Sequence, residues 1–426
     1  MSALGLTLAG AGMRIPGTQA SVIMGRRRDQ AALTLVAVAL VALAFLLQPV
    51  LSLALALLLA WGHPKAPRAL LAVLVLGALY LALVNVTKSP ESDLANYLEQ
   101  FNDARQLDLT TFLIVNAREP LYYLSLYGLA NLPWVDGRVY VFLSTLIPYL
   151  VFGTAVLRLC AALRLERRAQ LSLLVFLLFL PQLFSLSAHL LRQMLAASLV
   201  MLFLADHAVT GRRRWGLGLL GMLMHYSSMP FFLLSLLQPH KRYSSILSLL
   251  FHALTLVLVY ALAVQVAPLF LDVPVLGMVF QRLVNGEGAQ LDPLTLPVLG
   301  TAVLYLAVSL FSLARTSGRK LGAQDWTVML CTVTVCVVVL MTSVQPTLSE
   351  IAVRYYFYLY FLMGLVLPFL MVRVPLSRWG VHALALLSVP LFFYKLASGE
   401  WTFAPLIALL FEPAWMLWGH LASSVT

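Results

Sequence analysis

The chain has 426 residues, of which 61% are hydrophobic and 11% are charged, and its mean hydropathy is +0.91. Soluble globular domains hold about 45–50% apolar and about 25% charged residues, so this composition excludes a soluble enzyme, a disordered chain and a fibrous protein. The net charge of +11 comes from 28 basic and 17 acidic residues. Because Lys and Arg gather in the cytoplasmic loops of membrane proteins, the excess indicates topology rather than nucleic-acid binding.

The apolar residues form long blocks, and about 20 such residues are enough for one helical span. The sequence predicts a cytoplasmic tail over residues 1–30, with Met24 as an alternative start, and a single membrane domain over 31–426. We expect an all-α polytopic membrane protein with about 11 transmembrane helices and one re-entrant helical hairpin. The expected blocks lie at 31–47, 50–61, 69–86, 138–157, 170–188, 191–209, 216–238, 245–264, 295–314, 325–344, 352–372 and 379–397, with a weaker one at 403–419.

The first two blocks are predicted to form a hairpin that breaks at Gln48-Pro49. A single helix over 31–61 would be about 46 Å long, against a hydrocarbon core of about 30 Å. The segment after the third block favours an outward-facing loop, because it holds six acidic residues and only three basic ones: Glu91, Asp93, Glu99, Asp103, Asp108 and Glu119 against Lys88, Arg105 and Arg118. An outward loop there requires three crossings before it, which the hairpin supplies.

Block 216–238 is long enough for one span, but basic residues lie on both sides of it. A single crossing would place Arg315, Arg319 and Lys320 outside. A pair of half-helices that turns near His225 keeps the basic loops in the cytoplasm, and this re-entrant arrangement is the one we prefer. Irregular backbone at membrane depth is tolerated only where it is buried in protein or lines a cavity, so the turn is expected to face one.

The same topology places outer segments near 87–137 and 265–294, which are periplasmic if the membrane is a bacterial inner membrane. Segment 120–133 is rich in aromatic residues and too short to be a dependable span, which is typical of the membrane interface. The other carboxylates of the outer segments are interpreted as solvated loop charges.

Arg192 lies at the outer start of a helix, far from the basic loops. His189 precedes it by three residues and is expected to share its face. A guanidinium there can hold phosphate oxygens in a bidentate manner. The alternative to phosphate binding is that the long Arg192 side chain only extends its charge to the membrane–water interface.

His225 is flanked by hydroxyl residues and could serve as a general base at the apex of the turn, although a lone histidine in an apolar segment is usually a core residue. Arg354 opens an aromatic helix on the outer side. It either pairs with Glu350 four residues before it or forms a second phosphate site that Glu350 supports. Tyr355 and the tyrosines after it form either an aromatic belt or a platform for sugar.

Asp93 and Glu119 lie where carboxylates could bind or deprotonate a sugar hydroxyl. Cys160, Cys331 and Cys336 have no metal-binding spacing, and no nucleotide-binding or metalloprotease motif occurs in the chain. The sequence therefore predicts neither a metal nor another cofactor.

The order of these motifs resembles that of the EpsG family of Wzy-like polysaccharide polymerases. The matching pieces are Asp93 to Tyr97, Glu119-Pro120-Leu121-Tyr122-Tyr123, Leu191-Arg192-Gln193-Met194-Leu195-Ala196, His225-Tyr226-Ser227 and Arg354-Tyr355-Tyr356. Each motif is short, so the order and spacing carry the resemblance, which runs from about residue 90 to 365.

The resemblance implies a glycosyltransferase similar to the C-type integral-membrane enzymes, in a bacterial inner membrane and with its active site facing the periplasm. Its substrate would be an oligosaccharide linked to undecaprenyl diphosphate, and its product an O-antigen, capsule or exopolysaccharide. In this interpretation His225, Glu119 and Asp93 are catalytic, while Arg192, Arg354 and Arg118 bind diphosphate. Tyr97, Gln193, Glu350 and Tyr355 bind sugar or support the site.

The partners implied by the resemblance are the lipid bilayer, a chain-length regulator and a flippase, without nucleic acid. A transporter or flippase for a lipid-linked or anionic substrate, and a polysaccharide ligase, are the alternative functions.

Overall fold

The computed structural model describes residues 39–63, 67–91, 93–116, 119–236, 246–270, 300, 302–304, 306–307, 323–343, 349–398 and 402–420. Within these residues the regular elements are all helical. The predicted tail over 1–30 and most of the predicted outer segment 265–294 lie outside them.

Five helices are long and apolar enough to cross a membrane, and a bent pair would make a sixth. The five are α3 (Pro67–Val86), α7 (Gly137–Ala162), α10 (Leu191–Thr210), α17 (Ser349–Arg373) and α18 (Ser377–Ala397). The bent pair consists of α8 (Arg167–Leu178) and α9 (Pro181–His189), which meet at 48°. The protein is thus a polytopic α-helical membrane protein, but the predicted count of about 11 spans is not confirmed.

The remaining apolar helices include α2 (Pro49–Gly62), α13 (Ile246–Val266) and α16 (Ala323–Ser343). Residues 39–47 are also helical, and Gln48 caps α2 by accepting a hydrogen bond from the Val50 amide, so the predicted break at Gln48-Pro49 is confirmed. The weaker block predicted at 403–419 contains two short helices, α19 (Leu406–Phe411) and α20 (Ala414–Gly419).

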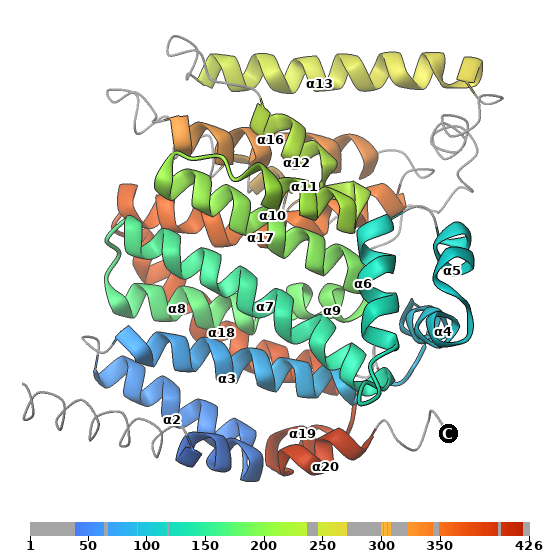
Figure 1. Cartoon of the computed structure of the whole chain (residues 1–426). Helices are drawn as coiled ribbons and strands as arrows, with labels where there is room; N and C mark the ends of the chain where they lie inside the picture. The colour runs from blue at the N-terminus through green and yellow to red at the C-terminus, as the bar shows by residue number, and fades with distance from the viewer. Residues whose placement is uncertain are drawn as a thin grey trace, which may run out of the picture.

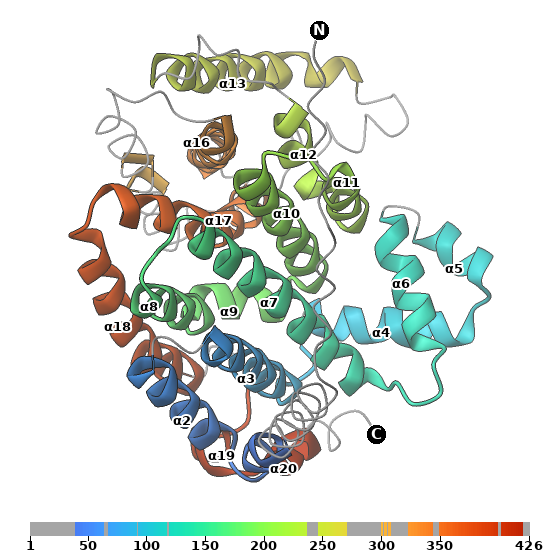
Figure 2. The same cartoon turned by 60° about the vertical axis from the view of Figure 1, so that its left-hand side comes forward.

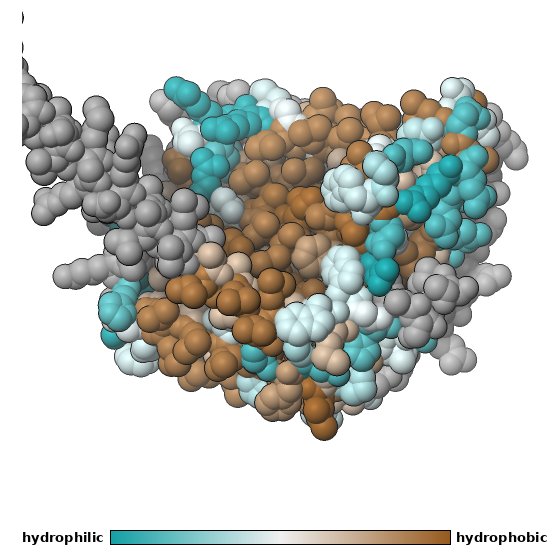
Figure 3. Space-filling view, turned by 60° about the horizontal axis from the view of Figure 1, so that its bottom comes forward, coloured by the Kyte–Doolittle hydropathy of each residue, from teal (hydrophilic) through white to brown (hydrophobic). Residues whose placement is uncertain are grey.

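The long helices are stacked in layers, and α13 lies at the outer edge beside α16 (Figures 1 and 2). One large hydrophobic core joins them, with Tyr358 and Phe361 of α17 among its fully buried residues. Some helices approach very closely: a Cβ atom on Gly153 of α7 would lie 2.2 Å from Cδ1 of Leu74 of α3. Figure 3 shows a broad apolar surface between more polar regions, as expected for a surface that faces lipid.

Three helices of the outer segment form a separate group at one end of the bundle (Figures 1 and 2). They are α4 (Asp93–Gln106), α5 (Leu109–Val115) and α6 (Pro120–Ala130). A second, smaller hydrophobic core holds them together and includes Leu191, the first residue of α10. This packing seats the group of α4, α5 and α6 directly beside Arg192.

Block 216–238 is divided into two helices, α11 (Trp215–Met224) and α12 (Met229–Leu236). Between them lie His225, which has an extended backbone (φ −158°, ψ 126°), and the 3₁₀ turn Tyr226–Ser228. The position of the break agrees with the predicted turn. That this pair re-enters the membrane from the cytoplasmic side stays a prediction.

Candidate active site

Glu119 is the buried acidic centre of the site. It is the N-cap of α6, but its side chain makes no capping hydrogen bond, because the carboxylate turns towards α10 instead. Its side chain is 2% exposed, and Arg192 donates a hydrogen bond of 2.6 Å from Nη1 to Oε2. Burying a carboxylate costs free energy of folding unless the group is paired with a cation and hydrogen-bonded. The pairing with Arg192 therefore stabilises the buried Glu119.

Tyrosine rings surround the Arg192 guanidinium. Its Cζ lies 5.4 Å from the ring centroid of Tyr97, 5.6 Å from that of Tyr122 and 5.8 Å from that of Tyr123. These distances are within the range of cation–π attraction. Arg192 also donates from Nη1 to the Tyr123 hydroxyl at 2.9 Å. Together the rings hold the guanidinium at the start of α10 while leaving its side chain 23% exposed.

His225 meets the same carboxylate from the break between α11 and α12. Its Nε2 lies 3.4 Å from Oε1 of Glu119, and its side chain is 3% exposed. Nδ1 accepts a hydrogen bond of 3.2 Å from the Ser227 amide. Because a backbone amide can only donate, this contact assigns the proton of the neutral imidazole to Nε2, on the side of Glu119.

A buried hydroxyl pair lies behind the imidazole. The Ser227 Oγ is 2.6 Å from Nδ1 of His225 and 3.0 Å from the hydroxyl of Tyr358, which comes from α17. With Nδ1 as the acceptor, Ser227 donates to it and Tyr358 donates to Ser227. The chain of contacts fixes both the ring orientation and the tautomer of His225.

Arg354 brings a second guanidinium to the histidine. Its Nη1 lies 3.5 Å from Nε2 of His225. Because both nitrogens carry protons, they are close neighbours and not a donor and an acceptor. The Gln193 side-chain amide donates to the Arg354 carbonyl oxygen at 2.5 Å, which ties α10 to α17 at this point. Gln193 is only 1% exposed, so its contacts suit a supporting role rather than direct contact with substrate.

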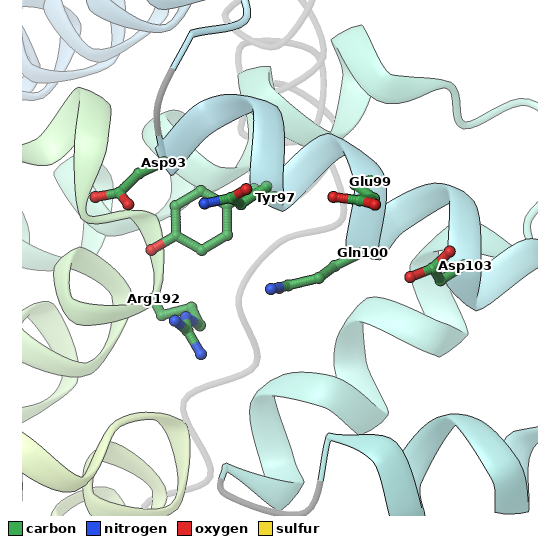
Figure 4. A pocket seen from close by; sticks show the side chains of 7 residues that line it. Asp93, Tyr97, Glu99, Gln100, Asp103 and Arg192 are labelled. Atoms are coloured by element: carbon green, nitrogen blue, oxygen red, sulfur yellow. The ribbon is translucent and has the colours of Figure 1, made fainter.

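A cavity of about 210 Å³ opens beside Arg192 (Figure 4). All of its other lining residues come from α4, and they are Asp93, Asn96, Tyr97, Glu99, Gln100 and Asp103. Burial raises the pKa of Tyr97 above its usual range, and the nearby Arg192 opposes that rise. The Tyr97 hydroxyl is therefore neutral and able to donate a hydrogen bond. The cavity thus offers hydrogen-bonding groups next to a fixed cation.

Lys88 is a buried cation that the sequence patterns did not single out. It is 2% exposed and donates from Nζ to the Ala188 carbonyl oxygen at 3.0 Å, at the end of α9. Its Nζ also lies 3.2 Å from Nε2 of His189. Burial lowers the pKa of Lys88 to about 8, although Asp93 and Glu91 oppose this shift. Lys88 therefore anchors the chain just before Arg192.

The prediction that His189 and Arg192 share one helical face is wrong. One helix, α9, ends at His189, and α10 begins only at Leu191, with Leu190 between them in a non-helical conformation (φ −102°, ψ 56°). The break turns His189 towards Lys88 and leaves Arg192 facing Glu119.

The structure places the other predicted site residues in different surroundings. Asp93 and Tyr97 line the cavity, whereas Tyr355 packs against Tyr358 with ring centroids 6.0 Å apart. Arg118 and the side chain of Glu350 lie outside the described residues. The roles assigned to all of these residues stay predictions.

The sequence patterns did not predict several side chains that the structure places at the site. Glu99 and Asp103 were interpreted as solvated loop charges, yet both line the cavity. Tyr123 could have been found, because it follows Glu119 by four residues and shares its helical face. Within the described residues, no group of three or more His, Cys, Asp or Glu side chains is arranged to hold a metal ion.

The comparison with protein families shows which family the chain belongs to. The model of the EpsG family matches residues 70–401, which covers most of the chain and includes Glu119, Arg192, His225 and Arg354. The chain belongs to the EpsG family. No curated protein and no solved structure shows significant similarity to it.

EpsG is a family of the Wzy-like polymerase type, associated with glycosyl transfer in polysaccharide biosynthesis. The resemblance noted in the sequence is thus confirmed at the level of the family. The similarity to C-type glycosyltransferases stays a prediction, because it concerns the fold and no solved structure matches the chain.

Proposed function

We propose that this EpsG-family protein is a polymerase that joins oligosaccharide repeat units carried on undecaprenyl diphosphate. Transfer would take place at the periplasmic face of a bacterial inner membrane and would yield a surface polysaccharide. The observation that carries the proposal is the buried cluster of Arg192, Glu119 and His225, with Arg354 beside it. It combines two guanidinium groups with a carboxylate and an imidazole next to a cavity.

The leaving group of this reaction is a lipid diphosphate, and negative charge develops on its oxygens in the transition state. Preorganised positive groups that meet such charge are among the strongest sources of catalysis. Arg192 is suited to this role because three tyrosine rings fix it while its side chain stays 23% exposed. Arg354 would hold a second oxygen.

The acceptor is a sugar hydroxyl, which must lose its proton as the new glycosidic bond forms. In the free protein Glu119 is neutralised by Arg192 at 2.6 Å and is a poor base. A diphosphate that binds Arg192 competes with Glu119 for the guanidinium. The released carboxylate, still buried, then becomes a stronger proton acceptor, because it has lost its neighbouring cation.

In the resulting step, the acceptor oxygen bonds to the anomeric carbon of the donor sugar. The bond from that carbon to the diphosphate oxygen breaks, and the diphosphate leaves with both electrons of the bond. Glu119 takes the hydroxyl proton, while His225, whose Nε2 lies 3.4 Å from Oε1 of Glu119, holds the carboxylate in place. Asp93, at the cavity wall, would orient the acceptor by accepting a hydrogen bond from it.

The test is the substitution Arg192→Ala in a strain that depends on this protein for its polysaccharide. Single lipid-linked repeats should accumulate, and long polymer should fall by a factor of about 100 or more, as when an oxyanion-binding donor is removed. Arg138→Ala is a matched control. Arg138 also pairs with a carboxylate, that of Asp136 at 3.1 Å, but it does not line the cavity.

Loss of Arg192 leaves a buried carboxylate unpaired, so the fold must be checked separately. The double variant Glu119→Gln with Arg192→Met removes both charges and should restore a normal protein level without restoring polymer. A normal distribution of polymer lengths in Arg192→Ala would overturn the proposal. Polymer that accumulates without being attached to its final acceptor would indicate a ligase instead.

A further inference from the structure

The cavity beside Arg192 has two chemically different ends. Asp93, Asn96, Tyr97, Gln100 and Asp103 follow the spacing of one helical face of α4, and Glu99 lies at its edge. In Figure 4 Arg192 and Tyr97 lie near Asp93, while Glu99, Gln100 and Asp103 lie further along the helix. The cation therefore marks one end of the cavity and carboxylates mark the other.

The end of the cavity that contains Glu99, Gln100 and Asp103, here called the α4 end, carries negative charge. Glu99 and Asp103 contribute two carboxylates there, whereas Arg192, at the other end, is already paired with the buried Glu119. In water-like surroundings, unit charges about 4 Å apart still interact measurably. An anionic substituent would be repelled from the part of the cavity that contains Glu99 and Asp103.

Gln100 contributes to the same end of the cavity. In Figure 4 the nitrogen of its side-chain amide lies at the free end of the side chain, on the side of Arg192. Its Oε1 atom is buried, so the amide nitrogen, a donor, is the atom that a ligand can reach. The carboxylates of Glu99 and Asp103 only accept hydrogen bonds. The matching ligand therefore carries hydroxyl or amino groups, which can donate to the carboxylates, rather than further carboxylates.

We propose that the α4 end of the cavity binds a sugar ring bearing only hydroxyl or amino-type substituents, and that Glu99 and Asp103 exclude acidic sugars such as uronates. The inference rests on the proposed polymerase function and names the substrate class of the same site. Its geometry also sets the direction of the substrate, with the diphosphate at Arg192 and the sugar along α4. A volume of about 210 Å³ suits a single ring rather than a whole repeat unit, since ordinary small-molecule sites take about 300–1,000 Å³.

The probe for the test is the lipid-linked repeat that accumulates in the Arg192→Ala strain, used as isolated and after its primary hydroxyl groups have been oxidised to carboxylates. Full-length protein in lipid nanodiscs is assayed for polymerisation of each form. The readout is the ratio of kcat/KM for the oxidised form to kcat/KM for the native form. We expect a ratio of about one-tenth or lower for the wild-type protein.

The double variant Glu99→Gln with Asp103→Asn should raise this ratio about fivefold or more, because it removes the two charges that face the oxidised group. Asp108→Asn is the matched control: it removes a carboxylate from the same helical group, but Asp108 caps α5 and does not line the cavity. Its ratio should equal that of the wild-type protein.

The outcomes separate the two proposals. If the native repeat is not polymerised by the wild-type protein, the proposed function fails. If the native repeat is polymerised but the oxidised form reacts equally well, or the double variant leaves the ratio unchanged, the inference is overturned while the function stands. An equal rise in the ratio for Asp108→Asn would show general electrostatics rather than selection in the cavity, and would also overturn the inference.

Discussion

At the scale of single residues, Lys88 links protonation to the geometry of the site. Its folded-state pKa of about 8 lies below the ordinary value of 10.5. The unfolded chain therefore binds more protons between these two values, and stability rises as the pH rises through this window. The gain is up to roughly 3 kcal/mol for a shift of this size. We expect the apparent Tm in detergent to increase from pH 8 to 10.5.

The variant Lys88→Met should flatten this pH dependence, because it fills similar space without a titrating group. It should also lower polymer synthesis at pH 7, since the anchor to the Ala188 carbonyl is lost just before Arg192. A pH dependence of the Tm that persists in Lys88→Met would mean that another group titrates in this window.

The site residues that could be predicted from the sequence share one feature. They are charged residues that lie alone on the outer side of apolar blocks. Arg192 and Glu119 are 73 positions apart, and Arg354 and His225 are 129 apart, yet both pairs are in contact or close to it. Lys88 was missed because it follows a span directly and reads as an ordinary loop cation. Its role depends on the break at Leu190, for which the sequence offers neither proline nor glycine.

At the scale of elements, the other end of α10 is joined to its neighbours by a buried carboxylate. Asp206 lies 2.8 Å from Nε of Arg214, which precedes α11, and 3.5 Å from Nη2 of Arg158 on α7. The Asp206 side chain is 1% exposed, whereas those of Arg158 and Arg214 are 48% and 58% exposed. The cost of breaking this cluster therefore depends on which partner is removed.

Removing both arginines with Arg158→Gln and Arg214→Gln leaves a buried charge without compensation, which costs about 3–5 kcal/mol. Asp206→Asn instead leaves two arginines that water can solvate, and should cost about 1 kcal/mol or less. Thermal unfolding of the purified variants measures the difference. Equal losses of stability in the two variants would contradict the asymmetry.

Element boundaries were predictable where a local signal coincided with a length limit. Gln48-Pro49 interrupts a block too long for one span, and the turn at His225 lies where the basic loops required a reversal. Helices α4 and α5 were not predicted, because a polar segment between spans was interpreted only by its charge. Yet α4 buries Leu94, Tyr97, Leu98 and Phe101 at helical spacing, a pattern that the sequence already contained.

At the scale of the whole molecule, the number of spans was the least predictable feature. Hydropathy counts apolar blocks, but it does not distinguish a straight span from a broken one. The described residues contain five long spans, one pair bent by 48° and several shorter apolar helices. The class of fold followed directly from composition, whereas the layering of the helices depends on close contacts such as that of Gly153 with Leu74.

The orientation of the whole molecule can be tested from the two ends of α10. This helix has 20 residues and is about 30 Å long, which matches the hydrocarbon core of a bilayer. Arg192 and the helical group of α4, α5 and α6 lie at one end, and the exposed Arg212 follows the other. If the site faces the periplasm, Arg212 must face the cytoplasm.

We therefore expect Gln106→Cys, at the exposed end of α4, to react with a membrane-impermeant maleimide in intact spheroplasts. Arg212→Cys should react only after permeabilisation. The native Cys160, Cys331 and Cys336 are all buried, so the unmodified chain provides a low background. Labelling of Arg212→Cys in intact spheroplasts, with Gln106→Cys protected, would show the opposite orientation, with the cavity facing the cytoplasm, and would contradict a periplasmic site.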